Sequence, residues 1–151
     1  MAVLVLQRLA GLAVEPRYSE LAQRSLGAMQ PLLARHPLGF GQWLVALDYA
    51  LSQPFEIAIV GSPDDEATRA LLGAATCGFR PHQVLACGTA GEAAPAVPLL
   101  ADRHLVNGKP AAYVCRGFTC QAPVTEAEGL RVLLERRSSC VASSSESLGS
   151  P

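Results

Sequence analysis

The chain has 151 residues, of which 50% are hydrophobic and 17% charged, and its formal net charge is −1. This length fits one ordinary domain, and the composition is too apolar for a disordered chain. With 11 Pro and 13 Gly, the apolar stretches are interrupted too often for a membrane bundle. The near-zero charge argues against a nucleic-acid or membrane partner. We therefore expect a soluble cytoplasmic globular domain that holds no cofactor.

The first 54 residues predict two or three helices. Residues 3–13 are apolar on several faces, and an amphipathic pattern runs over residues 16–33. Pro31 lies inside this pattern and is expected to kink the helix or end it early. A further helical stripe runs over residues 40–51 and ends before Pro54.

A β-α-β unit is expected next. Residues 57–60 form a short β-branched run that predicts a buried strand, and residues 83–87 predict a second strand. The helix between them is expected over residues 66–76, with Ser62 as its cap and Pro63 at its first position. About 30 residues is the usual length of a parallel crossover, so we expect the two strands to be parallel.

The last third predicts one more strand and one more helix. Residues 88–110 form a long Gly- and Pro-containing connector, and residues 111–115 form a third strand. Thr125 and Glu128 have the spacing of a capping box for a helix that ends near Arg137. The expected fold is a mixed α+β and α/β chain, with N-terminal helices before a three-stranded, mostly parallel layer with flanking helices.

The candidate thiol chemistry lies in Cys115 and Cys120, which are spaced C-x4-C with Arg116 beside the first. An odd total of five cysteines predicts reduced thiols rather than a secreted disulfide framework. The favoured interpretation is a half-buried strand cysteine and an unrelated loop cysteine. A thiol redox pair or disulfide is the alternative, with Arg116 favouring a thiolate. A metal site that also uses Cys87 and His104 is the third, although the spacing fits structural zinc poorly. No catalytic, cofactor-binding or metal-binding residue is assigned.

The ends of the predicted strands could also bind a small ligand. The loops over residues 61–65, 88–91 and 116–120 would share the carboxyl edge of a parallel sheet, where ligands bind. No Gly-rich phosphate loop occurs, and Asp64 and Asp65 would repel a phosphate. A small-ligand module therefore remains a hypothesis without a named ligand.

Two further charged groups have plain structural interpretations. Asp48 lies between apolar residues of a predicted helix, as either a buried, satisfied acid or a residue at the rim of a cavity. Residues 102–104, with the sequence Asp-Arg-His, predict a solvated turn at the surface.

Four stretches together resemble a known family. They are GQWLVALD at residues 41–48, EIAIVG at 56–61, PLL at 98–100 and GKPAAYVCRGFTCQAPVT at 108–125. The set resembles the C-terminal region of the thioredoxin-domain-containing protein family that includes spermatogenesis-associated protein 20. The likeness covers residues 3–135, although Gly129 stands where this family has an acidic residue.

The resemblance implies a fragment of a longer protein. In that family a thioredoxin-like domain precedes an α/α toroid similar to six-hairpin glycosidases, and a segment like this one comes last. Residues 1–54 would then be closing helices of the toroid, residues 55–137 a small α/β subdomain, and residues 138–151 a disordered Ser-rich tail. The apolar start without a helix cap also favours a fragment.

Three functions follow as hypotheses. The first is a non-catalytic structural portion of such a protein, whose partner is the rest of the parent chain. The second is part of a carbohydrate-active or thiol-redox enzyme in which Cys115 and Cys120 form a thiol pair. The third is the small-ligand module at the strand ends.

Overall fold

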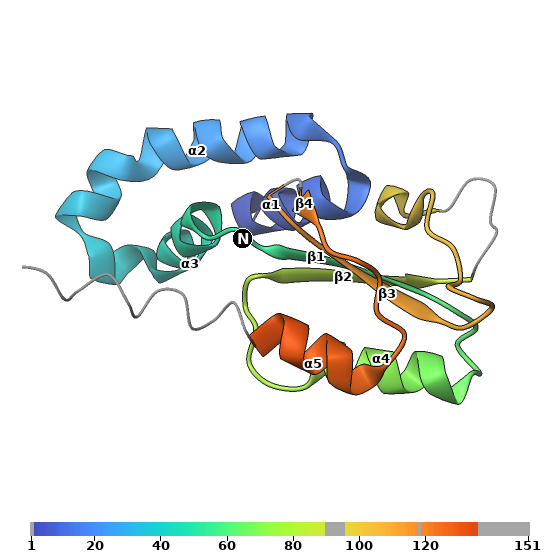
Figure 1. The fold of residues 1–151 in the computed structure, drawn as a ribbon. Coiled ribbons are helices and arrows are strands. Elements are labelled where there is room, and N and C mark those ends of the chain that lie inside the picture. The colour runs from blue at the N-terminus through green and yellow to red at the C-terminus, as the bar shows by residue number, and fades with distance from the viewer. Residues whose placement is uncertain (1, 90–95, 118, 136–151) are drawn as a thin grey trace, which may run out of the picture.

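The computed structural model describes residues 2–89, 96–117 and 119–135 (Figure 1). The helices are α1 (Ala2–Ala13), α2 (Pro16–Arg35), α3 (Gly41–Leu51), α4 (Glu66–Thr76) and α5 (Ala127–Glu135), with short 3-10 helices η1 (Pro37–Phe40) and η2 (Pro98–Leu100). The strands are β1 (Phe55–Val60), β2 (Gln83–Gly88), β3 (Ala111–Arg116) and β4 (Thr119–Cys120). The predicted tail over residues 138–151 lies outside the described residues.

The sheet is mixed, so the prediction of three mostly parallel strands is wrong. Four strands lie in the order β2-β1-β3-β4. The pairing of β1 with β2 is parallel, as expected, but β3 is antiparallel to β1 and β4 is antiparallel to β3.

The connector between β2 and β3 explains the reversed direction. β1 and β2 end together at Val60 and Gly88, and Val60 pairs with Ala111, the first residue of β3. The connector therefore begins and ends at one edge of the sheet. A third parallel strand would have required a crossover back to the opposite edge.

The fourth strand depends on a tight turn within residues 116–120, where the sequence predicts a loop. Arg116 pairs with Thr119, so only positions 117 and 118 separate the two strands. Gly117 has a φ of 53°, in the left-handed region that tight hairpin turns require. The strand has only two residues, too few for an alternating pattern to mark it.

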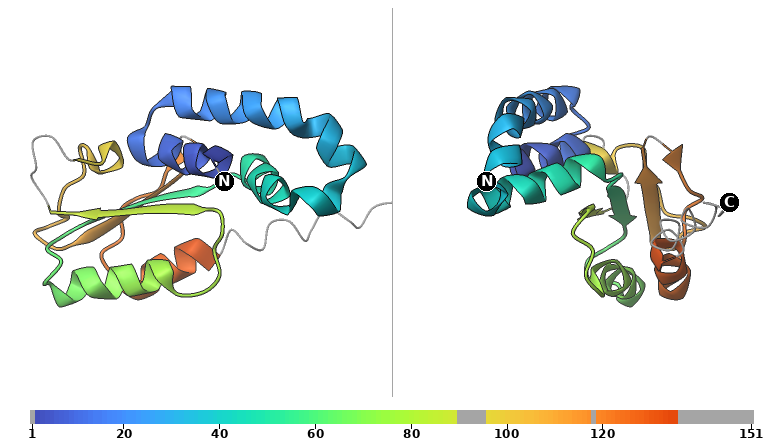
Figure 2. Two further views of the ribbon diagram at one scale, coloured as in Figure 1. Left: turned by 180° about the vertical axis from the view of Figure 1, so that it is seen from behind. Right: turned by 90° about the vertical axis from the view of Figure 1, so that its left-hand side faces the viewer.

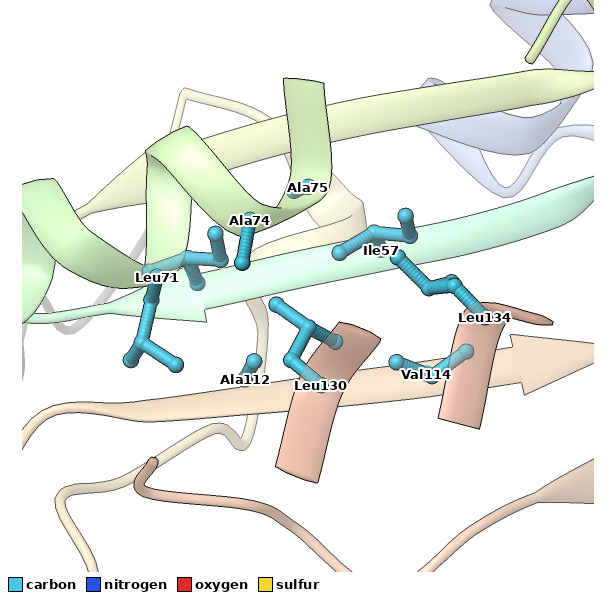
Figure 3. Close-up of a cluster of buried hydrophobic side chains, with 9 residues drawn as sticks. Ile57, Leu71, Ala74, Ala75, Ala112, Val114, Leu130 and Leu134 are labelled. Carbon is cyan, nitrogen blue, oxygen red and sulfur yellow. The ribbon is translucent and has the colours of Figure 1, made fainter. Parts of the chain in front are cut away.

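Helices cover both faces of the sheet (Figure 2). On one face, α4 and α5 enclose the main core, in which side chains from both helices meet those of β1 and β3 (Figure 3). On the other face, α1 and η2 cover a smaller cluster around Ala58, Val84 and Leu99. This double cover explains why every residue from Ile57 to Val60 is buried.

The N-terminal helices form a layer on the sheet. Gly11 of α1 lies so close to β2 that a Cβ there would stand 3.1 Å from Val84 Cγ2. α2 and α3 pack on α1 through Ala22, Leu26 and Ala46. The described part of the chain does not show an α/α toroid, and the assignment of residues 1–54 to one stays a prediction.

The two expected helix signals have different outcomes in the structure: the bend at Pro31 is present, and the Ser62 cap is not. α2 continues through Pro31 to Arg35, and Figure 1 shows its last turns bending away from the axis of the first. Pro31 lacks only the amide that would bond Gly27, so the helix bends without ending. The cap of α4 is Asp65, whose carboxylate accepts a 2.9 Å hydrogen bond from the Ala67 amide, and not Ser62.

Candidate functional site at the Cys115–Cys120 pair

Cys115 and Cys120 form a disulfide across the β3–β4 hairpin. They are directly paired in the strand register, which brings the two side chains to the same face of the sheet. Cys115 is buried, with 4% of its surface exposed, whereas Cys120 is exposed. The expectation of reduced thiols is therefore wrong for this pair. The alternative of a disulfide is the one that the structure contains.

Arg103 supplies the positive charge at the disulfide. Its Nη2 lies 3.5 Å from Cys115 Sγ and 3.7 Å from Cys120 Sγ. Its guanidinium also stacks on Tyr113, with Cζ 5.0 Å from the ring centroid. A cation in contact with both sulfurs stabilises a thiolate on either cysteine when the bond is broken.

Tyr113 anchors the segment that carries Arg103. Its hydroxyl donates a 2.7 Å hydrogen bond to the His104 carbonyl and accepts a 3.3 Å bond from the His104 amide. Because Tyr113 and Cys115 are two residues apart on β3, they share one face of the sheet. Residues 102–104 are thus not only the predicted solvated turn, since they place Arg103 beside the sulfurs.

Arg116, the predicted partner of the thiols, has other contacts. Its Nε donates a 2.6 Å hydrogen bond to the Gln53 carbonyl, and its guanidinium lies 5.0 Å from the centre of the Phe55 ring. Arg103 was missed because it is 12 residues from Cys115 in sequence, and only the return of the connector to the sheet brings them together.

Glu56 is the acidic group nearest to this site along the strands. It pairs with Cys115 in the β1–β3 register and therefore shares its face. Burial raises the pKa of the Glu56 carboxyl above its ordinary value. The Cys115–Cys120 disulfide thus lies beside the Arg103 guanidinium, and the Glu56 carboxyl is on the neighbouring strand β1.

The two other cysteines within the described residues do not extend the site. Cys77 and Cys87 are exposed free thiols. Partial desolvation raises the pKa of the Cys87 thiol, which favours the unreactive protonated form. Within residues 2–89, 96–117 and 119–135, no cluster of three or more His, Cys, Asp or Glu could hold a metal ion.

The carboxyl ends of the parallel strands are filled by the protein itself. A Cβ on Gly88 would lie 2.7 Å from Leu100 Cδ1, and one on Gly61 would lie 2.9 Å from Pro110 Cβ. The buried Thr68 side chain also contacts the Gly61 position. The edge at which a ligand site was expected is thus closely packed.

Asp48 is neither a buried acid nor a cavity residue. Its side chain is 68% exposed, and its Oδ2 lies 2.5 Å from His82 Nε2. This pair joins α3 to the loop before β2, which makes it a surface contact between the helical layer and the sheet.

Comparison with known proteins finds no matching family model, curated protein or solved structure. None of the helices in the described ranges has both the length and the hydropathy needed to cross a membrane.

Proposed function

We propose that this chain exchanges electrons with a partner dithiol through the Cys115–Cys120 pair. The observation that carries the proposal is the contact of one guanidinium, that of Arg103, with both sulfurs of a half-exposed disulfide. The exposed Cys120 is open to attack, and the buried Cys115 is the group that leaves.

The exchange proceeds in two balanced steps. A partner thiolate attacks Cys120 Sγ, the disulfide breaks, and the bonding electron pair leaves on Cys115 Sγ beside Arg103. The second thiolate of the partner then attacks the partner's sulfur atom in the mixed disulfide. Cys120 leaves as a thiolate, and the two partner sulfurs become joined. The partner becomes a disulfide and loses two electrons, and Cys115 and Cys120 gain these electrons and the two protons that the partner thiols give up.

A purely structural role for the disulfide has less support than a redox role. The two cysteines are five positions apart on strands that are already paired. The chain-entropy model assigns a loop this short about 2 kcal/mol of stabilisation. This entropic contribution does not depend on a cation at the sulfurs, so it does not account for the contact of Arg103 with both of them.

Arg103→Gln is expected to slow reduction of the disulfide about tenfold at neutral pH. A hydrogen bond to a charged group contributes about 1.5–3 kcal/mol, and a large part of this develops as Cys115 leaves as a thiolate. The rate is measured by rapid mixing with dithiothreitol, with acid quenching, alkylation and mass spectrometry.

The matched control is Arg116→Gln, which removes an equal charge next to Cys115 in sequence but not in contact with sulfur. The rate at which its disulfide is reduced should stay within about twofold of the rate in the unsubstituted protein. Equal slowing by both variants, or reduction that occurs only when the protein unfolds, contradicts the proposal.

We also propose a structural role, in which the chain packs against the rest of a parent chain as the family resemblance implies. The observation that favours it is the exposure of large apolar side chains on the N-terminal helical layer. Leu38 is 101% exposed and Leu51 79%, and Val45 is 48% exposed. Apolar side chains gathered on one layer favour a contact with another folded unit.

The isolated chain is then expected to bind a hydrophobic dye and to self-associate in sedimentation. Replacing Leu38, Val45 and Leu51 by Ser should remove most of the dye signal. Phe79→Ser is the control, because Phe79 is 92% exposed but lies in the loop after α4. A monomer that binds no dye contradicts the structural role and leaves the redox proposal intact.

A further inference from the structure

A cavity of about 430 Å³ lies beside the amino ends of β1 and β2. It is at the opposite end of these strands from the closely packed carboxyl ends. It is bounded by α1, α2, the last residues of α3 and the starts of β1 and β2. Its volume falls in the range of small-molecule sites. Half of the lining residues are apolar, among them Val14, Pro16, Ala22 and Val84.

The charges that line the cavity all have one sign. Glu15, Glu20 and Glu56 contribute carboxyl groups, and no Lys, Arg or His is among the lining residues. Glu15 already accepts a hydrogen bond from the Arg17 amide at the start of α2. The carboxyl group of Glu56 has no hydrogen-bond or ion-pair partner among the residues that the structure describes.

One further polar group beside the cavity lacks a partner within the described residues. Gln7 donates its side-chain amide to the Ala46 carbonyl, which leaves its Oε1 buried without a donor. An unpaired buried oxygen is costly, so a ligand that brings a hydrogen-bond donor to Gln7 Oε1 is favoured.

We propose that this cavity binds an organic ammonium compound, with its apolar body against α1 and α2 and its charged nitrogen at Glu56. The donors of an ammonium group match the carboxylate of Glu56 and the Oε1 of Gln7. The apolar lining matches an aromatic or branched aliphatic body. An anionic ligand would meet three carboxyl groups and no cation.

Glu56 is a desolvated acid, and an ammonium ligand would bind its ionised form. Burial raises the pKa of its carboxyl above the ordinary value of 4.5. The folded protein therefore holds a proton that the unfolded chain releases. The resulting stabilisation is complete below pH 4.5 and is lost as the pH rises through the folded pKa. The groups around Glu56 are Tyr49 on α3, the cavity residues Glu15 and Glu20, and the disulfide-bonded Cys115 on β3, while Arg8 on α1 acts on Tyr49.

The test is titration of the full chain with phenethylamine, its neutral counterpart 2-phenylethanol and the anionic 3-phenylpropionate, followed by calorimetry and amide NMR shifts. We expect phenethylamine to bind at least about tenfold more tightly than the alcohol, and the carboxylate not to bind. The shifted amides should lie in α1, α2 and the start of β1.

Glu56→Gln is expected to weaken amine binding about tenfold, because the carboxylate charge is lost while the shape is kept. This variant should fold at least as well as the parent at pH 7, since it removes an unpaired, half-buried acid. The matched control is Glu66→Gln, which removes the same charge at the start of α4, on the opposite face of the sheet. This variant should bind phenethylamine as tightly as the unsubstituted protein does.

Several outcomes overturn the inference. They are an absence of amine binding in the millimolar range, equal binding of the amine and the alcohol, equal weakening by Glu56→Gln and Glu66→Gln, and shifts that map away from the cavity. None of these outcomes bears on the reduction rate of the disulfide, so the redox proposal is tested separately.

Discussion

Replacing Gly61 by Ala is expected to lower the free energy of unfolding by about 3 kcal/mol. The new Cβ would contact Thr68 Oγ1 and stand 2.9 Å from Pro110 Cβ. Thr68 and Pro110 are both buried, so neither can move aside without displacing α4 or the start of β3. The measurement is urea-induced unfolding followed by circular dichroism.

A double-mutant cycle with Thr68→Ala identifies the cause. The Thr68 hydroxyl is buried without a hydrogen-bond partner among the described groups, so its removal costs little by itself. In Gly61→Ala/Thr68→Ala the main contact is gone, and the loss should be at least about 1 kcal/mol smaller than the sum of the single changes. Strict additivity would refute the packing explanation.

Gly73→Ala is the matched glycine control. Gly73 lies in α4, and a Cβ added there would have no neighbouring atom within 4 Å. Helix propensity alone should then stabilise the protein by about 0.5–1 kcal/mol. Opposite signs for the two Gly→Ala changes would show that the close approach at Gly61, and not the loss of glycine, governs the first result.

Leu130→Ala is expected to cost about 2–5 kcal/mol and to lower Tm by about 10 °C. The Leu130 side chain is fully buried and lies between α4 and the sheet (Figure 3). Its neighbours Ile57 and Leu71 are also fully buried, so the space left by the lost atoms cannot be filled from the surface. Differential scanning calorimetry gives both quantities.

Val132→Ala on the same helix is the control. Its side chain is 40% exposed, and Ala has the higher helix propensity, so the stability should change by less than about 0.5 kcal/mol. Equal losses for the two variants would mean that burial in the core does not set the cost of shortening a side chain of α5.

The two proposed sites share one face of the sheet. Glu56 lines the cavity and pairs in register with Cys115 of the disulfide. An ammonium ligand at Glu56 would therefore add a positive charge near the sulfur that leaves during exchange. The structure places both sites away from the core formed with α4 and α5.

Elements with a strong local pattern could be predicted from the order of the residues. The amphipathic spacing of α2 and α3, the apolar runs of β1, β2 and β3, and the α4 crossover were all correctly predicted. Each depends on periodicity or length within one segment, which neighbouring residues encode directly. Of the two outcomes expected at Pro31, the helix bends and does not end early, because the loss of one hydrogen bond did not outweigh the packing of α2 on α1.

The direction of β3, the existence of β4 and the composition of both sites depend instead on how distant segments pack. Arg103 and Cys115, like Glu56 and Cys115, are joined by strand pairing and by the path of the connector, not by local spacing. The cavity likewise arises where α1 and α2 meet the amino ends of β1 and β2. Such contacts are set by the global packing of the chain, and no local pattern of residue types encodes them.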